Sequence, residues 1–415
     1  MSQEQPAAKT KPLYDVRRVH IGKNAYLQEL SHECGELYSR TLVFFWRTVR
    51  RKGIWLQAKH LMRLFSSPKL HAHTSDACVQ AFFASLASWR QRRKTDAHAR
   101  PPSKRRWYFR IEYKRSAMQL SGGMLRLSNG QGNRPLLLPW THALPQTVVI
   151  RWTGTGYEAI ATYKIGDELS EEEPQDFDQR RRLHTAGIDL GEVHIAVSHD
   201  GQHSHLLNGR LLRSKRQYQN KLKAKLESRI AAKQKGSKRR KLLIRSKQKQ
   251  LRKIKHQIKD VEHKQTSALI STLRAEGVQR LVIGDVRDIR RELDVGPTTN
   301  QKLHQWSFGS VRHKLTYKAQ RVGMRVALQE ESYTSRTCPM CDHRRKSSPD
   351  GRVFSCSNKT CRWRGHRDAV GACNIRRRYL GLGPVVGVMA PPTGIRYVAG
   401  VRVAQRASSE KPLSL

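Results

Sequence analysis

The stretch TAGIDLGEVHIAVS, residues 185–198, decides the fold of this chain. Its first part is an apolar strand that ends at Asp189, and Gly191 lets the backbone turn tightly just after the acid. A second strand follows directly, and Asp200-Gly201 is a hairpin signal that leads to a third strand over 205–207. Aspartate is a common turn residue at strand ends, yet a carboxylate held in this way is also a candidate metal ligand. Asp189 by itself leaves both interpretations open.

The sequence after this hairpin alternates helical and strand patterns, which predicts an α/β layer with a mixed sheet. A very long helical pattern covers 210–274 and is broken near Gly236-Ser237. The remaining elements are strands at 279–283 and 324–328, helices at 303–321 and 368–379, and an aperiodic, proline-containing tail at 381–415 that we expect to be flexible.

The first 170 residues have a different pattern. Residues 1–12 are polar, and we expect them to be disordered. Helical periodicity dominates about 24–100, whereas strands are expected at 14–21, 107–113, 124–127, 135–140, 147–152 and 157–164. The simplest arrangement is a β-barrel-like module with a helical insertion after its first strand. An acidic linker at 167–178 separates this module from the second half, so the predicted fold class is multidomain α+β.

Four cysteines form two close pairs in the second half. They are Cys338, Cys341, Cys356 and Cys361, with the spacing C-x2-C, 14 residues, C-x4-C. Two such pairs place four thiolates tetrahedrally around Zn²⁺, and four protein ligands leave no open position, so the zinc would be structural. Four unrelated buried thiols are the alternative, but the surroundings are too polar for a core. The isolated Cys34, Cys78 and Cys373 are expected to be buried thiols, which fits a reducing, intracellular compartment.

The chain carries 80 Lys and Arg against 33 Asp and Glu, a net charge of +47 over 415 residues. Such a surface repels itself unless a polyanion neutralises it, so nucleic acid is the expected partner. A membrane surface is the rival partner. The sequence has no stretch of 18 apolar residues and no apolar run behind a basic start, so we expect neither a membrane span nor a signal peptide.

The positive charge is densest at 210–259, which holds 21 Lys or Arg and a single acid, Glu227. A charged run is usually a solvated helix face, but repulsion between residues four apart would destabilise a helix of this density without counter-ions. We therefore expect contacts with the phosphates of an RNA or of an RNA–DNA duplex. The candidate contacts are Lys221, Lys223, Lys225, Lys238, Arg239, Arg240, Lys241 and Arg245.

Acidic residues bracket the cysteine quartet. Glu330 and Glu331 precede it, and Asp368 follows it at the start of the expected last helix. Residues 369–372 are mostly small, which would let that helix press closely against a sheet. Capping of the positive helix end is the alternative role for Asp368.

These motifs closely resemble those of TnpB, the family of transposon-encoded, RNA-guided DNA nucleases, and of the related miniature type V CRISPR effectors. The resemblance is carried by TSRTCP (334–339), the cysteine quartet, HRD (366–368) with ACNI (372–375), and GIDLG (187–191). It is specific over about 185–380, whereas over 14–165 only the order of elements matches. It implies a wedge domain at 13–170 with inserted recognition helices, an RNase H-like (RuvC) nuclease domain at 180–334 and 364–380, and a zinc-finger insertion at 335–363.

One departure from the family pattern concerns the middle acid. The family usually has Glu-Asp at the end of a strand, where this chain has Gly284-Asp285. Asp285 is not a simple replacement, because a shift of one residue along a strand points the side chain to the opposite face. The resemblance implies that Glu331 is the relocated third acid, in preference to Glu330. The alternative is that both glutamates are exposed charges and the protein is a dead nuclease.

The resemblance implies an RNA-guided DNA endonuclease whose partners are a noncoding guide RNA and double-stranded target DNA. Asp189, Glu331 and Asp368 would hold two Mg²⁺ for phosphodiester hydrolysis, in a cytoplasmic, nucleoid-associated prokaryotic protein. Two other classes stay open: a nuclease-dead, guide-directed DNA-binding repressor, and a nucleic-acid-binding transposition accessory protein without a guide. The oligomeric state, the guide and the target-adjacent motif do not follow from the residues.

Overall fold

The computed structural model describes residues 12–105, 107–167, 174, 176–286, 306, 308–349 and 351–395. The start was expected to be disordered over 1–12; residues 1–11 lie outside the described residues, and Pro12 is already in a strand. Residues 303–305 and 307 of the helix expected at 303–321 also lie outside them. The chain divides into two compact units, which meet in the sequence at Gly166 and Asp167. No helix in the described part of the chain is both long enough and apolar enough to cross a membrane.

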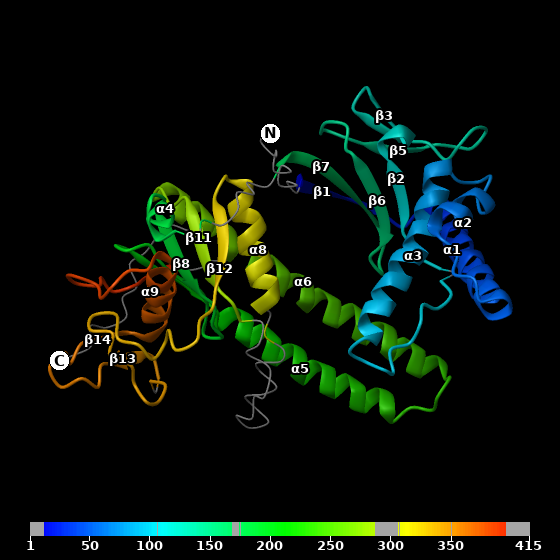
Figure 1. Cartoon of the computed structure of the whole chain (residues 1–415). Coiled ribbons are helices and arrows are strands. Elements are labelled where there is room, and N and C mark those ends of the chain that lie inside the picture. Colours follow the sequence, from blue (N-terminus) through cyan, green and yellow to red (C-terminus); the bar gives the residue numbers. More distant parts are fainter. Residues whose placement is uncertain are drawn as a thin grey trace, which may run out of the picture. The chain divides into compact units, whose positions relative to one another are not determined.

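The unit at 12–166 is built from short sheets and three helices (Figure 1). Its four-stranded sheet has the order β1-β7-β6-β2, and a three-stranded sheet has the order β3-β4-β5. The strands are β1 (Pro12–Gly22), β2 (Ile111–Lys114), β3 (Met118–Ser121), β4 (Met124–Leu127), β5 (Leu136–Pro139), β6 (Thr147–Trp152) and β7 (Tyr157–Asp167). Both sheets contribute to one apolar core, although the described residues do not join them by hydrogen bonds into a closed barrel.

Three helices follow β1, as the periodicity over about 24–100 predicts. They are α1 (Ala25–Lys52), α2 (Ala58–Leu64) and α3 (Ala72–Arg93). Asn24 caps α1 by accepting a hydrogen bond from the backbone N–H of Leu27. The strand expected at 107–113 starts only at Ile111. Tyr108 has a φ of 56°, a left-handed backbone conformation that is incompatible with an extended strand.

The second unit contains a six-stranded mixed sheet with the order β12-β11-β8-β9-β10-β15. After the short helix α4 (Phe177–Arg181), the strands β8 (Thr185–Asp189), β9 (His194–His199) and β10 (Ser204–Asn208) form an antiparallel meander, as the opening motif predicts. The strands β11 (Arg280–Gly284) and β12 (Arg325–Gln329) extend the sheet parallel to β8. The mixed α/β prediction is therefore confirmed.

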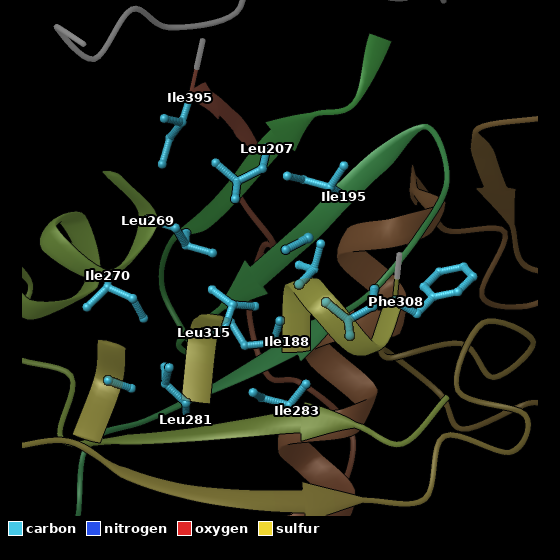
Figure 2. Packing of buried hydrophobic residues seen from close by; sticks show 14 of the residues in the cluster. Ile188, Ile195, Leu207, Leu269, Ile270, Leu281, Ile283, Phe308, Leu315 and Ile395 are labelled. Carbon is cyan, nitrogen blue, oxygen red and sulfur yellow. The ribbon is translucent and has the colours of Figure 1, made fainter. Parts of the chain in front are cut away.

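The two faces of this sheet are covered by different helices. The helices α6 (Lys238–Ala275) and α8 (Phe308–Arg321) pack on one face, where Ile188, Leu281 and Ile283 meet Leu269 and Leu315 (Figure 2). Helix α9 (Arg367–Leu380) packs on the other face, where Ile375 and Tyr379 contact Val282 of β11. Because side chains alternate along a strand, odd and even positions of β11 face different helices.

Helix α5 (Arg210–Ala231) and α6 form the expected long basic pair, with the break at Gly236 and Ser237 (Figure 1). Buried Leu226 and Ile230 belong to its apolar seam, but Leu242 is 54% exposed and does not. The base of the pair is held by Glu262, a buried acid of α6 that accepts hydrogen bonds from Arg216 of α5 and Lys314 of α8.

The tail at 381–415 was expected to be flexible; residues 396–415 lie outside the described residues, and within 381–395 the expectation is wrong for one segment. Thr393–Ile395 forms β15, which pairs in parallel with β10 at the edge of the sheet. Ile395 is buried in the same core as Leu207 (Figure 2). A three-residue strand directly after Pro391-Pro392 is too short to show a period, so this pairing is determined by tertiary contact.

Candidate metal centre

Asp189 and Gly284 lie at the carboxyl ends of two neighbouring parallel strands. Ile188 of β8 is paired with Ile283 of β11, and both side chains point into the core below α6 and α8. The next residue on each strand, Asp189 and Gly284, therefore faces α9. The ends of parallel strands are the usual place for ligands in α/β sheets.

Helix α9 packs unusually closely against this edge, as its small residues predict. A Cβ atom built at Gly187 of β8 would lie 2.2 Å from the carbonyl oxygen of Ala372, and one built at Gly371 of α9 would lie 2.6 Å from Oδ2 of Asp189. Both distances are far below van der Waals contact, so only glycine fits at these positions. The close packing brings Asp368, in the first turn of α9, to the same edge as Asp189.

Glu331 occupies the space that a side chain at Gly284 would need. A Cβ atom at Gly284 would lie 2.3 Å from Oε2 of Glu331 and 3.0 Å from Cδ1 of Ile375. Of the two glutamates that follow β12, Glu330 is exposed and accepts a hydrogen bond from Ser332, whereas Glu331 points inward. The structure thus places Glu331 and Asp368 close enough to Asp189 for their charges to act on it.

Asp285 points to the other face of the sheet, as the alternation along β11 predicts. Its Oδ1 lies 3.0 Å from Nη1 of Arg312 on α8. The acid next to Gly284 is therefore held by an ion pair on the α8 face, away from Asp368 on the α9 face.

The negative charges at this edge act most strongly on Asp189. Burial raises the pKa of Asp189 well above its usual value, and the negative charges of Glu331 and Asp368 raise it further. Burial, together with the charge of Asp285, raises the pKa of Glu331 to about 7. Oε2 of Glu331 is buried without a hydrogen-bond partner. An orphaned carboxylate oxygen beside two further carboxylates is an arrangement that divalent cations stabilise, so the residues fit the cation site that the sequence predicts.

Asp368 differs electrostatically from its neighbours. Burial alone would raise its pKa, but the hydrogen bond with His194 and the nearby positive charges keep the pKa below its usual value. Nδ1 of His194 lies 2.7 Å from Oδ2 of Asp368. Asp368 is therefore ionised at neutral pH without any bound cation.

Two histidines at this edge, His194 and His366, were missed by the sequence interpretation. Together with Asp368 they place one ligand atom each within 4.8 Å of one another. His366 lies beside the HRD motif, which was a signal in the sequence. His194 could not be identified from the sequence. Its orientation depends on an irregular pairing between β9 and β10, which the residue pattern does not indicate.

The four predicted zinc cysteines come together in a small module. Sγ of Cys338 lies 3.9 Å from that of Cys361, and Sγ of Cys341 lies 3.6 Å from that of Cys356. All four sulfur atoms lie within 4.8 Å of one another. Tetrahedral zinc with bonds of about 2.3 Å separates its sulfur ligands by about 3.8 Å, so this quartet fits Zn²⁺. A short hairpin of β13 (Val353–Ser355) and β14 (Arg364–His366) connects the module to α9.

The predicted nucleic-acid contacts lie on the basic helix pair. Lys221, Lys223 and Lys225 are exposed on α5. Arg240 is half-buried in the first turn of α6, and its neighbours Lys238, Arg239, Lys241 and Arg245 are exposed. A cationic first turn opposes the positive end of the helix dipole, so an anion at this turn would stabilise it. Ser237 caps the helix by accepting a hydrogen bond from the N–H of Arg240.

Two family models match the chain. Residues 169–290 match the model described as a probable transposase, OrfB of IS605, and residues 308–375 match the Cas12f1-like TNB domain. Between them the two models include the candidate carboxylates and the cysteine quartet.

Curated relatives support the same family. The chain is 29% identical over 126 residues to a TnpB-like protein of Methanocaldococcus jannaschii, a match that covers 30% of this chain and 44% of the relative. It is 25% identical over 194 residues to the CRISPR-associated endodeoxyribonuclease Cas12f1 of Sulfoacidibacillus thermotolerans, covering 46% of this chain and 44% of the relative. The matches thus span less than half the length of these relatives.

Solved structures share the fold. The Cas12f1 chain from a complex with single-guide RNA and target DNA aligns with a TM-score of 0.56 at 11% identity, over 84% of this chain and 82% of that one. CasPhi-2 (Cas12j) bound to crRNA aligns with a TM-score of 0.50 at 10% identity, over 90% and 99%. The motifs, family models, relatives and fold agree, and the chain resembles TnpB proteins and miniature type V CRISPR effectors.

Proposed function

We propose that this protein is an RNA-guided DNA endonuclease that cuts with a single metal-dependent centre. The observation that carries the proposal is the position of Glu331, whose carboxylate fills the space above Gly284 beside Asp189 and Asp368. A third acid is thus present at the point where the strand-borne one is missing. Acids gathered at one sheet edge destabilise the folded protein unless a cation neutralises them. Their presence therefore favours an active nuclease over an inactive one.

The topology of the second unit supports an RNase H-like (RuvC) domain at 180–334 and 364–380. An antiparallel meander, β8-β9-β10, is extended on the β8 side by two parallel strands, β11 and β12. The zinc module at 335–363 is inserted between the strand before Glu331 and the helix that carries Asp368. The unit at 12–166 corresponds to the wedge domain, and α1 to α3 correspond to the recognition helices.

The chain's own residues divide the work at the centre. Asp189 of β8 and Asp368 of α9 lie at the same edge of the sheet, and Glu331 approaches this edge from the end of β12. Two Mg²⁺ bound by these carboxylates would activate a water molecule and stabilise the leaving 3′ oxygen. His194 holds the Asp368 carboxylate in place through its hydrogen bond. The basic helices α5 and α6 would grip the phosphates of the guide RNA or its duplex with target DNA, while base pairing reads the target sequence.

The experiment that tests this proposal uses the whole chain purified with its nucleic acid. Sequencing of the copurified RNA, followed by cleavage of a matching target with and without Mg²⁺, separates three classes of function. A defined RNA with Mg²⁺-dependent cutting supports the proposal. A defined RNA with target binding and no cutting indicates a nuclease-dead repressor, and a heterogeneous RNA population indicates a nucleic-acid-binding accessory protein.

Exchanging the positions of the glutamate and the glycine tests the role of Glu331. We expect Gly284→Ala to displace the Glu331 carboxylate and lower cleavage by about 100-fold, since a misplacement of about 1 Å has this effect on catalysis. Glu331→Ala should be inactive, and the double variant Gly284→Glu/Glu331→Ala should regain activity, because the new side chain can enter the vacated space. Gly309→Ala is the matched control, since a Cβ there meets no atom within 4 Å. Full activity of Glu331→Ala, or inactivity of Glu330→Ala instead, would contradict the assignment.

The salt dependence of RNA binding tests the basic helices. Replacing Lys221, Lys223 and Lys225 by Gln should reduce the slope of log affinity against log salt by up to about 0.7–0.9 for each phosphate that the protein no longer neutralises. The matched variant with three arginines keeps the charge and should keep the slope. Filter binding across a salt series measures both, and an unchanged slope in the glutamine variant would place the phosphate-binding residues elsewhere.

A further inference from the structure

The cluster of His194, His366 and Asp368 is chemically different from the three carboxylates beside it. Two imidazoles and one carboxylate offer ligand atoms within 4.8 Å of one another. His194 is buried and so are both ring nitrogens of His366, whereas the Asp368 side chain is 27% exposed, so the cluster opens toward solvent at Asp368. The two imidazole rings are 5.2 Å apart and tilted by 58°. A cation can therefore enter from the side of Asp368.

The backbone of β9 is distorted at the point where it orients His194. Leu207 of β10 is paired with Ala196, but the next residue, Asn208, is paired with His194, so Ile195 is an extra residue on β9. Ile195 and Ala196 both pack in the core on the α6 and α8 face, whereas Val197 packs against α9. Without the extra residue, His194 would lie on the same face as Ala196, away from Asp368. The bulge therefore turns His194 toward Asp368, which is a frequent use of β-bulges beside functional sites.

His366 is positioned from a separate part of the chain. It ends β14, whose pairing with β13 ties it to the zinc module, and it precedes the first turn of α9. Val353 is its partner in the hairpin. Two independent structural features, a bulge in the sheet and a hairpin of the cysteine module, thus converge on Asp368.

We propose that His194, His366 and Asp368 form a binding site for a divalent transition-metal ion, with Mn²⁺ preferred over Mg²⁺. Imidazole nitrogen is a good ligand for the first-row transition ions, whereas Mg²⁺ strongly prefers oxygen ligands and retains its waters. Mn²⁺ accepts both nitrogen and carboxylate ligands. The inference rests on the proposed nuclease function, because the site shares Asp368 with the catalytic carboxylates and would be one of its two cation positions.

His194 and Asp368 already lie 2.7 Å apart, joined by a hydrogen bond. Two ligands of one octahedral ion with bonds of about 2.1 Å are separated by about 3 Å, so little movement is needed. A cation held there would replace the hydrogen bond between the two side chains.

Nitrogen coordination can be measured directly, without any cleavage. The full chain is loaded with zinc, freed of excess zinc by gel filtration, and given one equivalent of Mn²⁺ for electron spin-echo envelope modulation. We expect a nitrogen-14 modulation from directly bound imidazole in the wild-type protein. The concentration of free Mn²⁺ is measured from its solution electron paramagnetic resonance signal, which gives the affinity of each protein for Mn²⁺. We expect His366→Asn and His194→Asn to bind Mn²⁺ at least about tenfold more weakly than the wild-type protein. Even residues that contact a metal ligand indirectly contribute about 10–100-fold to metal affinity.

His203→Asn is the matched control, because His203 belongs to the same sheet unit and its side chain is 58% exposed. It should keep both the affinity and the nitrogen signal. Bound Mn²⁺ without nitrogen modulation in the wild-type protein would overturn the inference, and so would equal affinities for Mn²⁺ and Mg²⁺. The wild-type spectrum decides this even if a variant fails to fold.

The outcome is distinguishable from a failure of the proposed function. Imidazole-bound Mn²⁺ in a protein that cuts no target with any cation would support the site and contradict the nuclease. Mg²⁺-dependent cutting by a protein whose Mn²⁺ spectrum lacks nitrogen modulation would support the nuclease and contradict the site.

Discussion

Asp189→Asn should abolish target cleavage and leave guide RNA binding unchanged. A bound cation contributes several kcal/mol of transition-state stabilisation, so the loss of this ligand is expected to lower the cleavage rate by about a thousandfold or more. Asp189 ends β8 and packs against Gly371 of α9. It does not lie on the basic helix pair, so RNA binding should not depend on it. Single-turnover cleavage and filter binding with the same RNA separate the two effects. Residual cutting near the wild-type rate would contradict the metal-ligand role.

The same substitution should stabilise the metal-free protein. The pKa of Asp189 is raised in the folded state, so this carboxyl works against folding at neutral pH. The cost begins as the pH rises above the unfolded-state pKa, is complete above the raised pKa, and disappears as the pH falls below both. An uncharged, isosteric amide removes that cost. We expect a higher melting temperature for Asp189→Asn than for the wild-type protein in Mg²⁺-free buffer at pH 7, and a smaller difference with Mg²⁺. Asp260→Asn, at an exposed acid of α6, is the control and should change neither quantity measurably.

Removing the zinc should unfold the module at 335–363 and inactivate the centre. Structural zinc contributes about 10–16 kcal/mol in small zinc modules, and the core of this one is limited to a few residues around Cys338, Phe354 and Val370. Glu331 and His366 flank the module, so both would lose their positions. Hydrogen exchange over 338–366 should accelerate strongly after chelation, while Leu281 and Ile283 in the sheet stay protected.

A cysteine outside the quartet supplies the control for this prediction. Cys341→Ser should lose zinc, whereas Cys373→Ala, at a buried thiol of α9, should retain it. A colorimetric assay of released zinc measures the difference. Unchanged protection of 338–366 in the zinc-free protein would show that the module folds without a metal ion.

Most of the correct predictions about the fold and the site came from the opening motif at 185–198 and from the cysteine spacing. An apolar strand, an acid, a tight turn and a hairpin leave few arrangements for β8 to β10, and Asp189 lies at the edge they predict. The spacing of the cysteines was sufficient for the module, because four thiolates have one common geometry around zinc. Both features depend on local sequence, which is why they could be recognised without a structure.

The features that could not be predicted depend on tertiary contact. Gly284 is an ordinary strand residue in the sequence, and only its contact with Glu331 shows that its missing side chain makes room for an acid from another strand. The bulge at Ile195 reverses the direction of His194 without any glycine to indicate it. Edge strand β15 forms because Ile395 packs into a core whose other residues are distant in the sequence.

The most direct test of the central claim is cleavage of a matched target by the purified RNA complex. The RNA that copurifies with the chain defines the target, and a plasmid library with randomised flanking sequence supplies the adjacent motif. Cutting should require the guide match, Mg²⁺ or Mn²⁺, and each of Asp189, Glu331 and Asp368. Guide-dependent binding with no cutting in either metal, by a wild-type complex that retains its zinc, would contradict the account.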